Sequence, residues 1–272
     1  MTGTPMTGTS MTGSAAGRLG IADLTISFGS KRVVAIDELR LDHGEILGLA
    51  GESGSGKSMT TLAILGLAHT VGATVSGSIT LDGQELTGLA EDELRAIRGR
   101  RIAAIFQSPS TAFNPVYRVG TLVTRALRLH GASRSAAPDL AAAAMRQVLL
   151  SPDLMRRYPS QLSGGQLQRV AIALAIALRA EILLADEPTS ALDVTVQAEV
   201  LDLLRDLRES IGMSILFISH DLAVVAELCD RVAVMRQGLI VEQGPASQVL
   251  SAPANPYTAE LLDSVPKLAS QA

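Results

Sequence analysis

Gly51-Glu-Ser-Gly-Ser-Gly-Lys57-Ser58 is the stretch that decides the fold expected for this sequence. It matches the phosphate-binding pattern G-x-x-x-x-G-K-[ST], and it stands between a short apolar run, Glu45–Ala50, and a helix-like pattern that begins at Lys57. Glycines allow a tight turn in which successive backbone N–H groups point at phosphate oxygens, and the helix adds its positive end. The residues expected to hold the phosphates are Gly51, Ser53, Gly54, Gly56, Lys57 and Ser58, with Ser58 also a ligand of Mg²⁺. The alternative is a glycine-rich turn without a ligand.

Strand-like and helix-like segments alternate on both sides of this loop. The expected strands are Leu19–Phe28, Glu45–Ala50, Gly77–Leu81, Ile102–Phe106, Ile182–Ala185 and Ser214–Ser219, followed by a hairpin of Arg231–Met235 and Leu239–Glu242. The expected helices are Lys57–Ala68, Thr121–Leu150 with breaks near Gly131 and Pro138, Gly165–Ala180, Val194–Ser210 and Leu222–Leu228. This alternation predicts an α/β fold with a mostly parallel sheet. The long helical stretch, about residues 85–161, predicts an inserted subdomain.

Composition excludes several classes of protein. Of the 272 residues, 47% are hydrophobic and 18% are charged, which is typical of a folded globular chain and excludes disorder over most of it. The net charge of −4 argues against a protein that coats nucleic acid. Because Cys229 is the single cysteine, a disulfide framework and a multi-cysteine metal site are excluded. We expect Cys229 to be a core residue.

The ends and apolar runs of the chain indicate its compartment. Met1–Gly17 repeats Met-Thr-Gly with small polar residues and lacks the basic and apolar regions of a secretory signal. We expect it to be a disordered tail and the cytoplasm to be the default location. The longest apolar run, Val170–Leu178, has nine residues, whereas a membrane-spanning helix needs about 20. The chain is therefore not expected to cross a membrane by itself.

Two carboxylates follow the apolar strand Ile182–Ala185. Asp186 and Glu187 stand at its carboxyl end, which is where ligands bind in α/β sheets. Asp186 is suited to hold Mg²⁺, and Glu187 is suited to polarise an attacking water as a general base. Taken alone such a pair is more often a solvated turn. The phosphate-binding loop upstream favours the functional interpretation.

A second glycine motif, Ser163-Gly164-Gly165-Gln166, precedes a long helix-like segment. Ser163 is a good N-cap, and the glycines leave backbone N–H groups free at a helix N-terminus, so the motif predicts a second anion site. One nucleotide needs only one phosphate-binding loop, so this second site requires a reason. With the preceding leucine, the pentapeptide Leu162–Gln166 resembles the signature sequence of ABC-type ATPases, the nucleotide-binding subunits of ABC transporters.

Other positions agree with this resemblance in order and spacing. Gln107 resembles the glutamine of the Q-loop, Ser190-Ala-Leu-Asp193 the D-loop, His220 the switch histidine and Phe28 the aromatic residue that stacks on adenine. The resemblance covers about residues 19–266. It implies a P-loop NTPase core with a mostly parallel sheet, N-terminal antiparallel strands and an inserted α-helical subdomain. Simpler explanations are that Phe28 is a core residue, Gln107 a surface amide and His220 a histidine bonded within its own loop.

The family resemblance also implies the roles of these residues and a composite reaction site. ATP hydrolysis would involve Lys57, Gln107, Glu187 and His220. The ligands of Mg²⁺ would be Ser58, Gln107 and Asp186. Two cassettes pair head to tail, so that Ser163, Gly164, Gly165 and Gln166 contact the ATP held by the other chain. The implied partners are a second ATPase chain and two membrane permease subunits, with an external substrate-binding protein acting indirectly. No nucleic acid is implied, and the location is peripheral, on the cytoplasmic face of the inner membrane.

Two segments narrow the type of transporter. Gln107–Gly120 and Ala252–Pro266 resemble parts of the oligopeptide, dipeptide and nickel importer ATPases. We therefore expect a tail (1–17), an ATP-binding domain (18–250) and a short C-terminal extension (251–272), with a heterodimer favoured over a homodimer. Peptide is the first choice of cargo, and nickel or a metal chelate is the alternative. A soluble ABC ATPase of DNA repair or translation and an inactive ATP-binding regulator are the remaining possibilities.

Overall fold

A computed structural model describes residues 17–190 and 192–264. The expected N-terminal tail therefore lies outside the described residues except for Gly17, and the expected C-terminal extension is described only as far as Ser264. Within the described ranges, no helix combines the length and the apolar character needed to cross a membrane.

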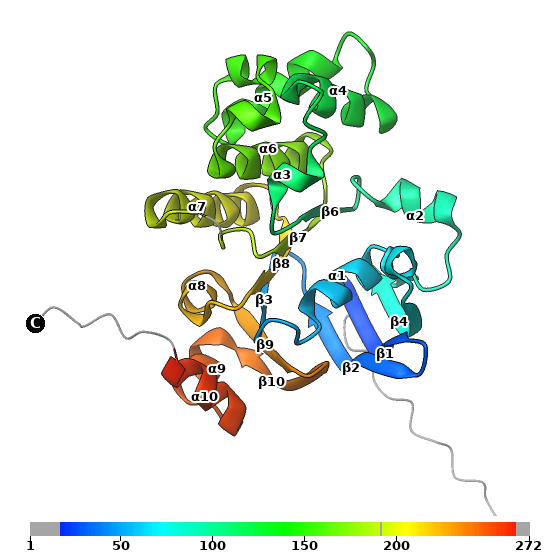
Figure 1. Ribbon diagram of the computed structural model, residues 1–272, viewed down its shortest axis with the longest axis vertical. Helices are drawn as coiled ribbons and strands as arrows, with labels where there is room; N and C mark the ends of the chain where they lie inside the picture. The colour runs from blue at the N-terminus through cyan, green and yellow to red at the C-terminus, as the bar shows by residue number, and fades with distance from the viewer. Residues whose placement is uncertain (1–16, 191, 265–272) are drawn as a thin grey trace, which may run out of the picture.

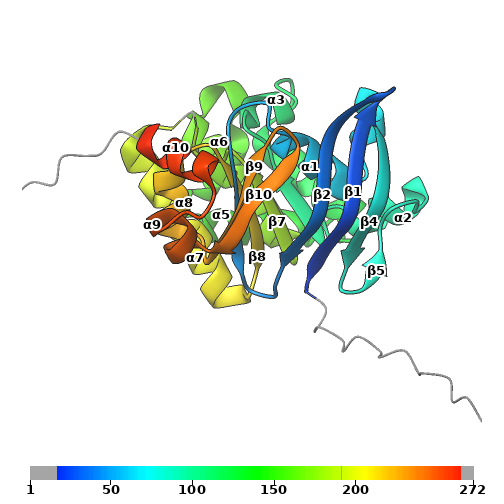
Figure 2. The ribbon, with the colours of Figure 1, turned by 90° about the horizontal axis from the view of Figure 1, so that it is seen from below.

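The described chain forms two sheets that lie side by side (Figure 2). In the six-stranded sheet the order is β10-β9-β3-β8-β7-β6, and only β10 runs antiparallel to its neighbour. Its strands are β3 (Ile46–Ala50), β6 (Ile102–Ile105), β7 (Ile182–Asp186), β8 (Ser214–Ser219), β9 (Arg231–Arg236) and β10 (Leu239–Pro245). The four-stranded sheet, in the order β2-β1-β4-β5, is antiparallel and consists of β1 (Leu19–Phe28), β2 (Lys31–Leu41), β4 (Thr74–Leu81) and β5 (Gln84–Glu85). The predicted α/β architecture is confirmed.

Helices cover the parallel sheet and extend beyond it. They are α1 (Lys57–Ile64), α2 (Glu91–Ile97), α3 (Pro109–Ala112), α4 (Val119–Leu129), α5 (Ala137–Gln147), α6 (Gly164–Ala177), α7 (Val194–Ile211), α8 (Leu222–Leu228), α9 (Ala246–Ser251) and α10 (Pro256–Ser264), with 3₁₀ turns at Ala68–Val71, Pro152–Arg156 and Pro159–Gln161. Helices α3 to α6 gather at one end of the molecule, away from the antiparallel sheet (Figure 1). Strand β6, although inside the segment 85–161, pairs with β7 in the parallel sheet. The division of the chain into domains stays a prediction.

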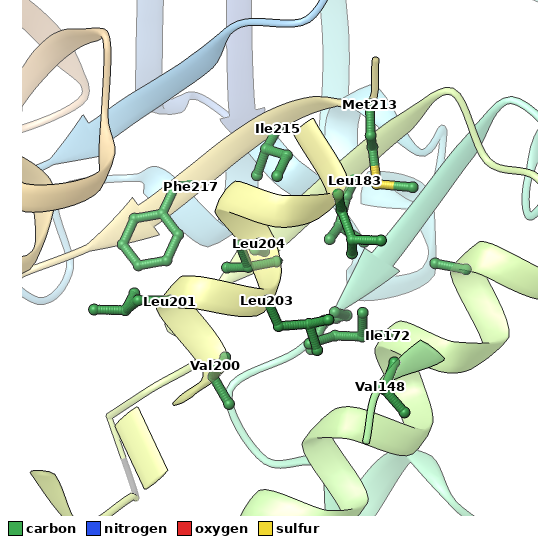
Figure 3. Close-up of a cluster of buried hydrophobic side chains, with 14 of the residues drawn as sticks. Val148, Ile172, Leu183, Val200, Leu201, Leu203, Leu204, Met213, Ile215 and Phe217 are labelled. Carbon is green, nitrogen blue, oxygen red and sulfur yellow. The ribbon is translucent and has the colours of Figure 1, made fainter. Parts of the chain in front are cut away.

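The central strands are buried on both faces, which explains their continuous apolar sequences. In β8, Ile215 and Phe217 face one hydrophobic core, while Leu216 and Ile218 face another. The first core lies under α5, α6, α7 and α8, where Leu204 of α7 packs near Phe217 (Figure 3). The second lies between the parallel sheet, α1 and the antiparallel sheet. The parallel sheet therefore lies between two hydrophobic cores.

Two local features differ from the sequence-based expectation. Strand β2 is absent from the predicted strands, because its buried positions fall at Val34 and Ile36 and then at Leu39 and Leu41, so that two adjacent exposed residues break the period of two. The first helix ends at Ile64 rather than Ala68. Gly66 adopts a left-handed conformation (φ +65°) there, and glycine tolerates this conformation at a helix end.

The core assignment predicts a large difference between two identical substitutions. Leu204 is fully buried in α7, whereas Leu129 at the end of α4 is 77% exposed. Leu204→Ala should lower the free energy of unfolding by about 2–5 kcal/mol, and Leu129→Ala should change it by less than about 0.5 kcal/mol. Equilibrium urea unfolding measures both. Equal effects would contradict the described packing.

Candidate functional site

Four neighbouring parallel strands bring the expected site residues to one edge of the sheet. The phosphate-binding loop follows β3, His220 follows β8, Asp186 ends β7 and Gln107 comes two residues after β6. Because the strands lie in the order β3-β8-β7-β6 and run in the same direction, their carboxyl ends meet at a single edge. Residues far apart in the sequence thereby become neighbours, in the place where α/β sheets bind ligands.

The loop needs its first glycine for steric reasons. Gly51 has φ +149°, and a Cβ atom there would lie 2.1 Å from the carbonyl oxygen of Met235 in β9. Gly54 and Gly56 also have positive φ values, of +80° and +112°. A further brace comes from Gly238, whose N–H donates to the Ser55 carbonyl at 2.8 Å. The hairpin turn after β9 therefore fixes the path of the loop.

The ammonium group of Lys57 is bound within its own loop. It donates to the carbonyl oxygens of Gly51 (2.6 Å) and Glu52 (2.7 Å) and to the hydroxyl of Ser55 (3.3 Å). Burial lowers the pKa of Lys57, while the nearby carboxylates of Glu187, Asp186 and Glu52 oppose this shift. An ammonium has three donors, so an anionic ligand would have to exchange with these partners.

Glu187, which follows β7, has contacts with residues that follow the neighbouring strands β6 and β8. Its carboxylate accepts from the Gln107 amide, Nε2 to Oε2, at 2.7 Å, and Nδ1 of His220 lies 3.0 Å from Oε1. The backbone of Glu187 has φ +48°, an uncommon value for a residue with a side chain. Its N–H donates to the Ile218 carbonyl of β8 at 2.9 Å, which fixes this conformation. Such strain occurs preferentially at functional sites.

Asp186, the last residue of β7, is hydrogen-bonded to Ser58, the second residue of α1. The pKa of Asp186 is raised, mainly by burial and also by the negative charge of Glu187. The hydrogen bond with Ser58 and the positive charge of Lys57 act against this rise. Within the described ranges, no group of three or more His, Cys, Asp or Glu side chains is arranged to hold a metal. Mg²⁺ is usually bound by one or two protein oxygens together with phosphate oxygens and water. A buried carboxylate and a hydroxyl beside a phosphate-binding loop fit that requirement.

A cavity of about 480 Å³ joins these elements. It is lined by Phe28, Val33, Ser53, Gly54, Gly56, Lys57, Ser58, Met59, Gln107, Glu187 and His220. Nine of the expected residues therefore share one cavity, and Phe28, at 38% exposure, is on its wall rather than in the core. Val33 and Met59 were not expected. Val33 belongs to the unpredicted strand β2, and nothing in the pattern around Met59 marks it as a site residue.

The second glycine motif does not line this cavity. Ser163 caps α6: its hydroxyl accepts from the Gln166 N–H at 3.2 Å, and the Gln166 side chain accepts from the Ser163 N–H at 3.0 Å. Gly165 allows α6 to approach α7, because a Cβ there would lie 2.3 Å from Cγ1 of Val196. The helix N-terminus expected for the motif is thus confirmed, and an anion at that terminus stays a prediction.

The two remaining sequence assignments concern the D-loop and the cysteine. Ser190 comes three residues after Glu187, and its hydroxyl donates to the Glu187 carbonyl at 3.1 Å. Asp193 caps α7, because its carboxylate accepts from the Val196 N–H at 3.0 Å. Ala191 lies outside the described residues. Cys229 is buried in the core as expected, and burial raises the pKa of its thiol.

The tight fit at Gly51 predicts an effect on stability. Gly51→Ala should cost more than the roughly 1–2 kcal/mol of a left-handed conformation alone, because the added methyl meets a backbone carbonyl that cannot rotate away. Gly29→Ala is the matched control, since Gly29 also has a positive φ (+57°) but has open space around it. Chemical denaturation of both variants measures the difference, and equal losses would contradict the described loop.

The chain is similar to proteins of known type over nearly its whole length. The family model described as ABC transporter matches residues 19–190, and the model described as oligopeptide/dipeptide transporter, C-terminal region, matches residues 241–272. A glutathione import ATP-binding protein of Salmonella typhimurium is 44% identical over 92% of this chain and 42% of its own length. A dipeptide transport ATP-binding protein of Haemophilus influenzae is 43% identical over 92% of this chain and 78% of its own length. The chain thus spans less than half of the first of these relatives.

A solved structure has the same fold. It is a dimeric post-hydrolysis state of the ATP-binding cassette MJ0796 bound to ADP and Pi, with a TM-score of 0.73 and 28% identity, covering 84% of this chain and 98% of that one. Since the family model alone spans more than half of the sequence, and the relatives and the solved cassette agree with it, the chain belongs to the ABC transporter family.

Proposed function

We propose that this chain binds and hydrolyses ATP as the energy-supplying subunit of an importer for oligopeptides or dipeptides. The observation that carries the enzymatic part is the Glu187 carboxylate, held between Gln107 and His220 at the cavity beside Lys57. The importer class is supported by the match of residues 241–272 and by the names of the Salmonella and Haemophilus relatives.

The triphosphate would occupy the loop after β3. The positive ends of dipoles would come from the backbone N–H groups of Ser53, Gly54 and Gly56 and from the N-terminus of α1. The open space around Gly54 leaves room for phosphate oxygens. Lys57 would exchange its loop carbonyls for phosphate oxygens. Phe28, a partly exposed residue that lines the same cavity, offers an aromatic face for the adenine ring.

Hydrolysis would depend on Glu187 as the general base. An ionised carboxylate accepts hydrogen bonds from both the Gln107 amide and an N–H of His220, so the two partners orient it in the strained backbone position. Glu187 would take a proton from the attacking water, and His220 and Lys57 would stabilise the negative charge that develops on the γ-phosphate.

Ser58 and Asp186 are the proposed ligands of Mg²⁺, with Gln107 as a third. When bound, the cation would neutralise part of the negative charge of the phosphates. The raised pKa of Asp186 fits this role, because a buried carboxylate gains stabilisation from a cation that water does not otherwise provide.

The proposed assembly contains a second ATPase chain, two permease subunits and an external binding protein, at the cytoplasmic face of the inner membrane. The position of Ser163–Gln166 supports a composite site, because these residues form a capped helix start that does not line the cavity around Lys57. They would contact the nucleotide of the second chain. A heterodimer is proposed because importers of the oligopeptide/dipeptide type, which this sequence resembles, usually use two different ATPase chains. A nickel importer is not favoured, because the Salmonella and Haemophilus relatives are named for glutathione and dipeptide.

Glu187→Gln tests the catalytic assignment. In the complex assembled with its permease subunits, this variant should retain ATP affinity within about threefold and lose turnover by about 10²–10⁴-fold, because the amide cannot accept the proton of water. Glu209→Gln, an exposed position on α7, is the control and should keep wild-type turnover. Normal turnover in Glu187→Gln would remove this residue from its proposed role.

The same assembled complex in vesicles tests the cargo. With the binding protein present, ATP should drive uptake of a labelled dipeptide, and the Glu187→Gln complex should not. Uptake of Ni²⁺ in place of peptide would contradict the proposed cargo while leaving the ATPase assignment intact.

A further inference from the structure

The C-terminal helix α10 contacts the phosphate-binding loop. The N–H of Glu52 donates to the phenol oxygen of Tyr257, the second residue of α10, at 3.4 Å. This N–H belongs to the same peptide unit as the Gly51 carbonyl, which accepts from Lys57 at 2.6 Å. One peptide unit of the loop is therefore held at both ends, by the ammonium group on its carbonyl and by the phenol on its amide.

The phenol is itself fixed in position. Tyr257 is only 3% exposed, and the guanidinium carbon of Arg236 lies 4.4 Å from the centre of its ring. Arg236 ends β9 and comes one residue after Met235, whose carbonyl restricts the loop at Gly51. The stacking of arginine on the ring and the hydrogen bond to Glu52 therefore connect α10 to the same part of the loop.

The start of α10 is anchored to β10. The Asn255 side chain donates to the Val241 carbonyl at 3.1 Å and accepts from the Tyr257 N–H at 2.9 Å. The Glu242 carboxylate accepts from the N–H groups of Ala254 (2.8 Å) and Asn255 (3.2 Å). In Figure 1, α9 and α10 lie at the β9–β10 end of the sheet. The phenol oxygen is thus fixed to the sheet rather than carried on a free end of the chain.

From this geometry we propose that Tyr257 is a positioning residue for the phosphate-binding loop, so that the C-terminal segment supports the nucleotide site without lining its cavity. The inference rests on the proposed function. When a triphosphate draws Lys57 away from the Gly51 carbonyl, that peptide unit loses one of its two restraints. The phenol of Tyr257 keeps the other, and thereby maintains the orientation of the loop in the nucleotide-bound state, where the restraint matters most.

Tyr257→Phe tests this role, because it removes the phenol oxygen and keeps the buried ring and its contact with Arg236. Equilibrium binding of a fluorescent ATP analogue with Mg²⁺ to the full chain should show a Kd raised about twofold to tenfold, the effect of one neutral hydrogen bond. In the assembled complex KM for ATP should rise by a similar factor with kcat retained, since the restraint acts on binding.

Tyr158→Phe is the matched control. Tyr158 also has an arginine over its ring, Arg118 at 5.8 Å from the centroid, but it precedes α6, whereas the phenol of Tyr257 accepts from the Glu52 N–H of the phosphate-binding loop. The Tyr158→Phe variant should bind the analogue as the wild type does.

Equal Kd values for Tyr257→Phe and the wild type would overturn the positioning role of Tyr257. A wild-type chain that binds no ATP would overturn the proposed function instead.

Asn255→Ala provides a second test, which applies even if Tyr257→Phe is not recovered folded. This change keeps the phenol but removes the two bonds of the Asn255 side chain, to the Val241 carbonyl and from the Tyr257 N–H, and leaves those of Glu242 in place. Nucleotide affinity should fall in the same direction, and adding Tyr257→Phe should lower it little further, because both changes release the same restraint. Wild-type affinity in Asn255→Ala, or fully additive losses, would count against the proposal.

Discussion

The order of four parallel strands, β3-β8-β7-β6, is the constraint on which the site depends. Each strand delivers one functional segment at its carboxyl end, and each is buried between two hydrophobic cores. A shift of any strand by one residue would turn its buried side chains to the opposite face. The same packing that stabilises the sheet therefore fixes the spacing between Lys57, Glu187, Gln107 and His220.

The charged side chains at the carboxyl edge of the sheet are held by a few hydrogen bonds. Lys57 lies near Glu187 and Asp186, yet its hydrogen bonds go to loop carbonyls and to a hydroxyl. Glu187 has an amide and an imidazole as its hydrogen-bond partners, and it occupies a strained backbone conformation. In the proposed function, a site organised in this way would receive a polyanion and present a carboxylate to it.

Much of this arrangement can be predicted from the sequence, because the phosphate-binding loop and the carboxylates at Asp186 and Glu187 follow apolar strands with short local patterns. Strand β2 and the wall residue Val33 could not be predicted, since their pattern changes phase at two adjacent exposed residues. The contact between Tyr257 and Glu52 joins positions 205 residues apart and leaves no periodic signal. Only tertiary packing brings such residues together.

The two glycine motifs are separated in the fold, and this separation is central to the proposed function. One chain presents a phosphate-binding loop with its proposed catalytic carboxylate, Glu187, and at a different place a capped helix start at Ser163. The most direct measurement is a structure of the assembled complex with Mg²⁺ and ATP bound to a hydrolysis-deficient variant. We predict that the triphosphate on Lys57 is closed by a helix start from the other ATPase chain, while Ser163 contacts the second nucleotide. A triphosphate enclosed by one chain alone, with Ser163 far from either nucleotide, would contradict this prediction.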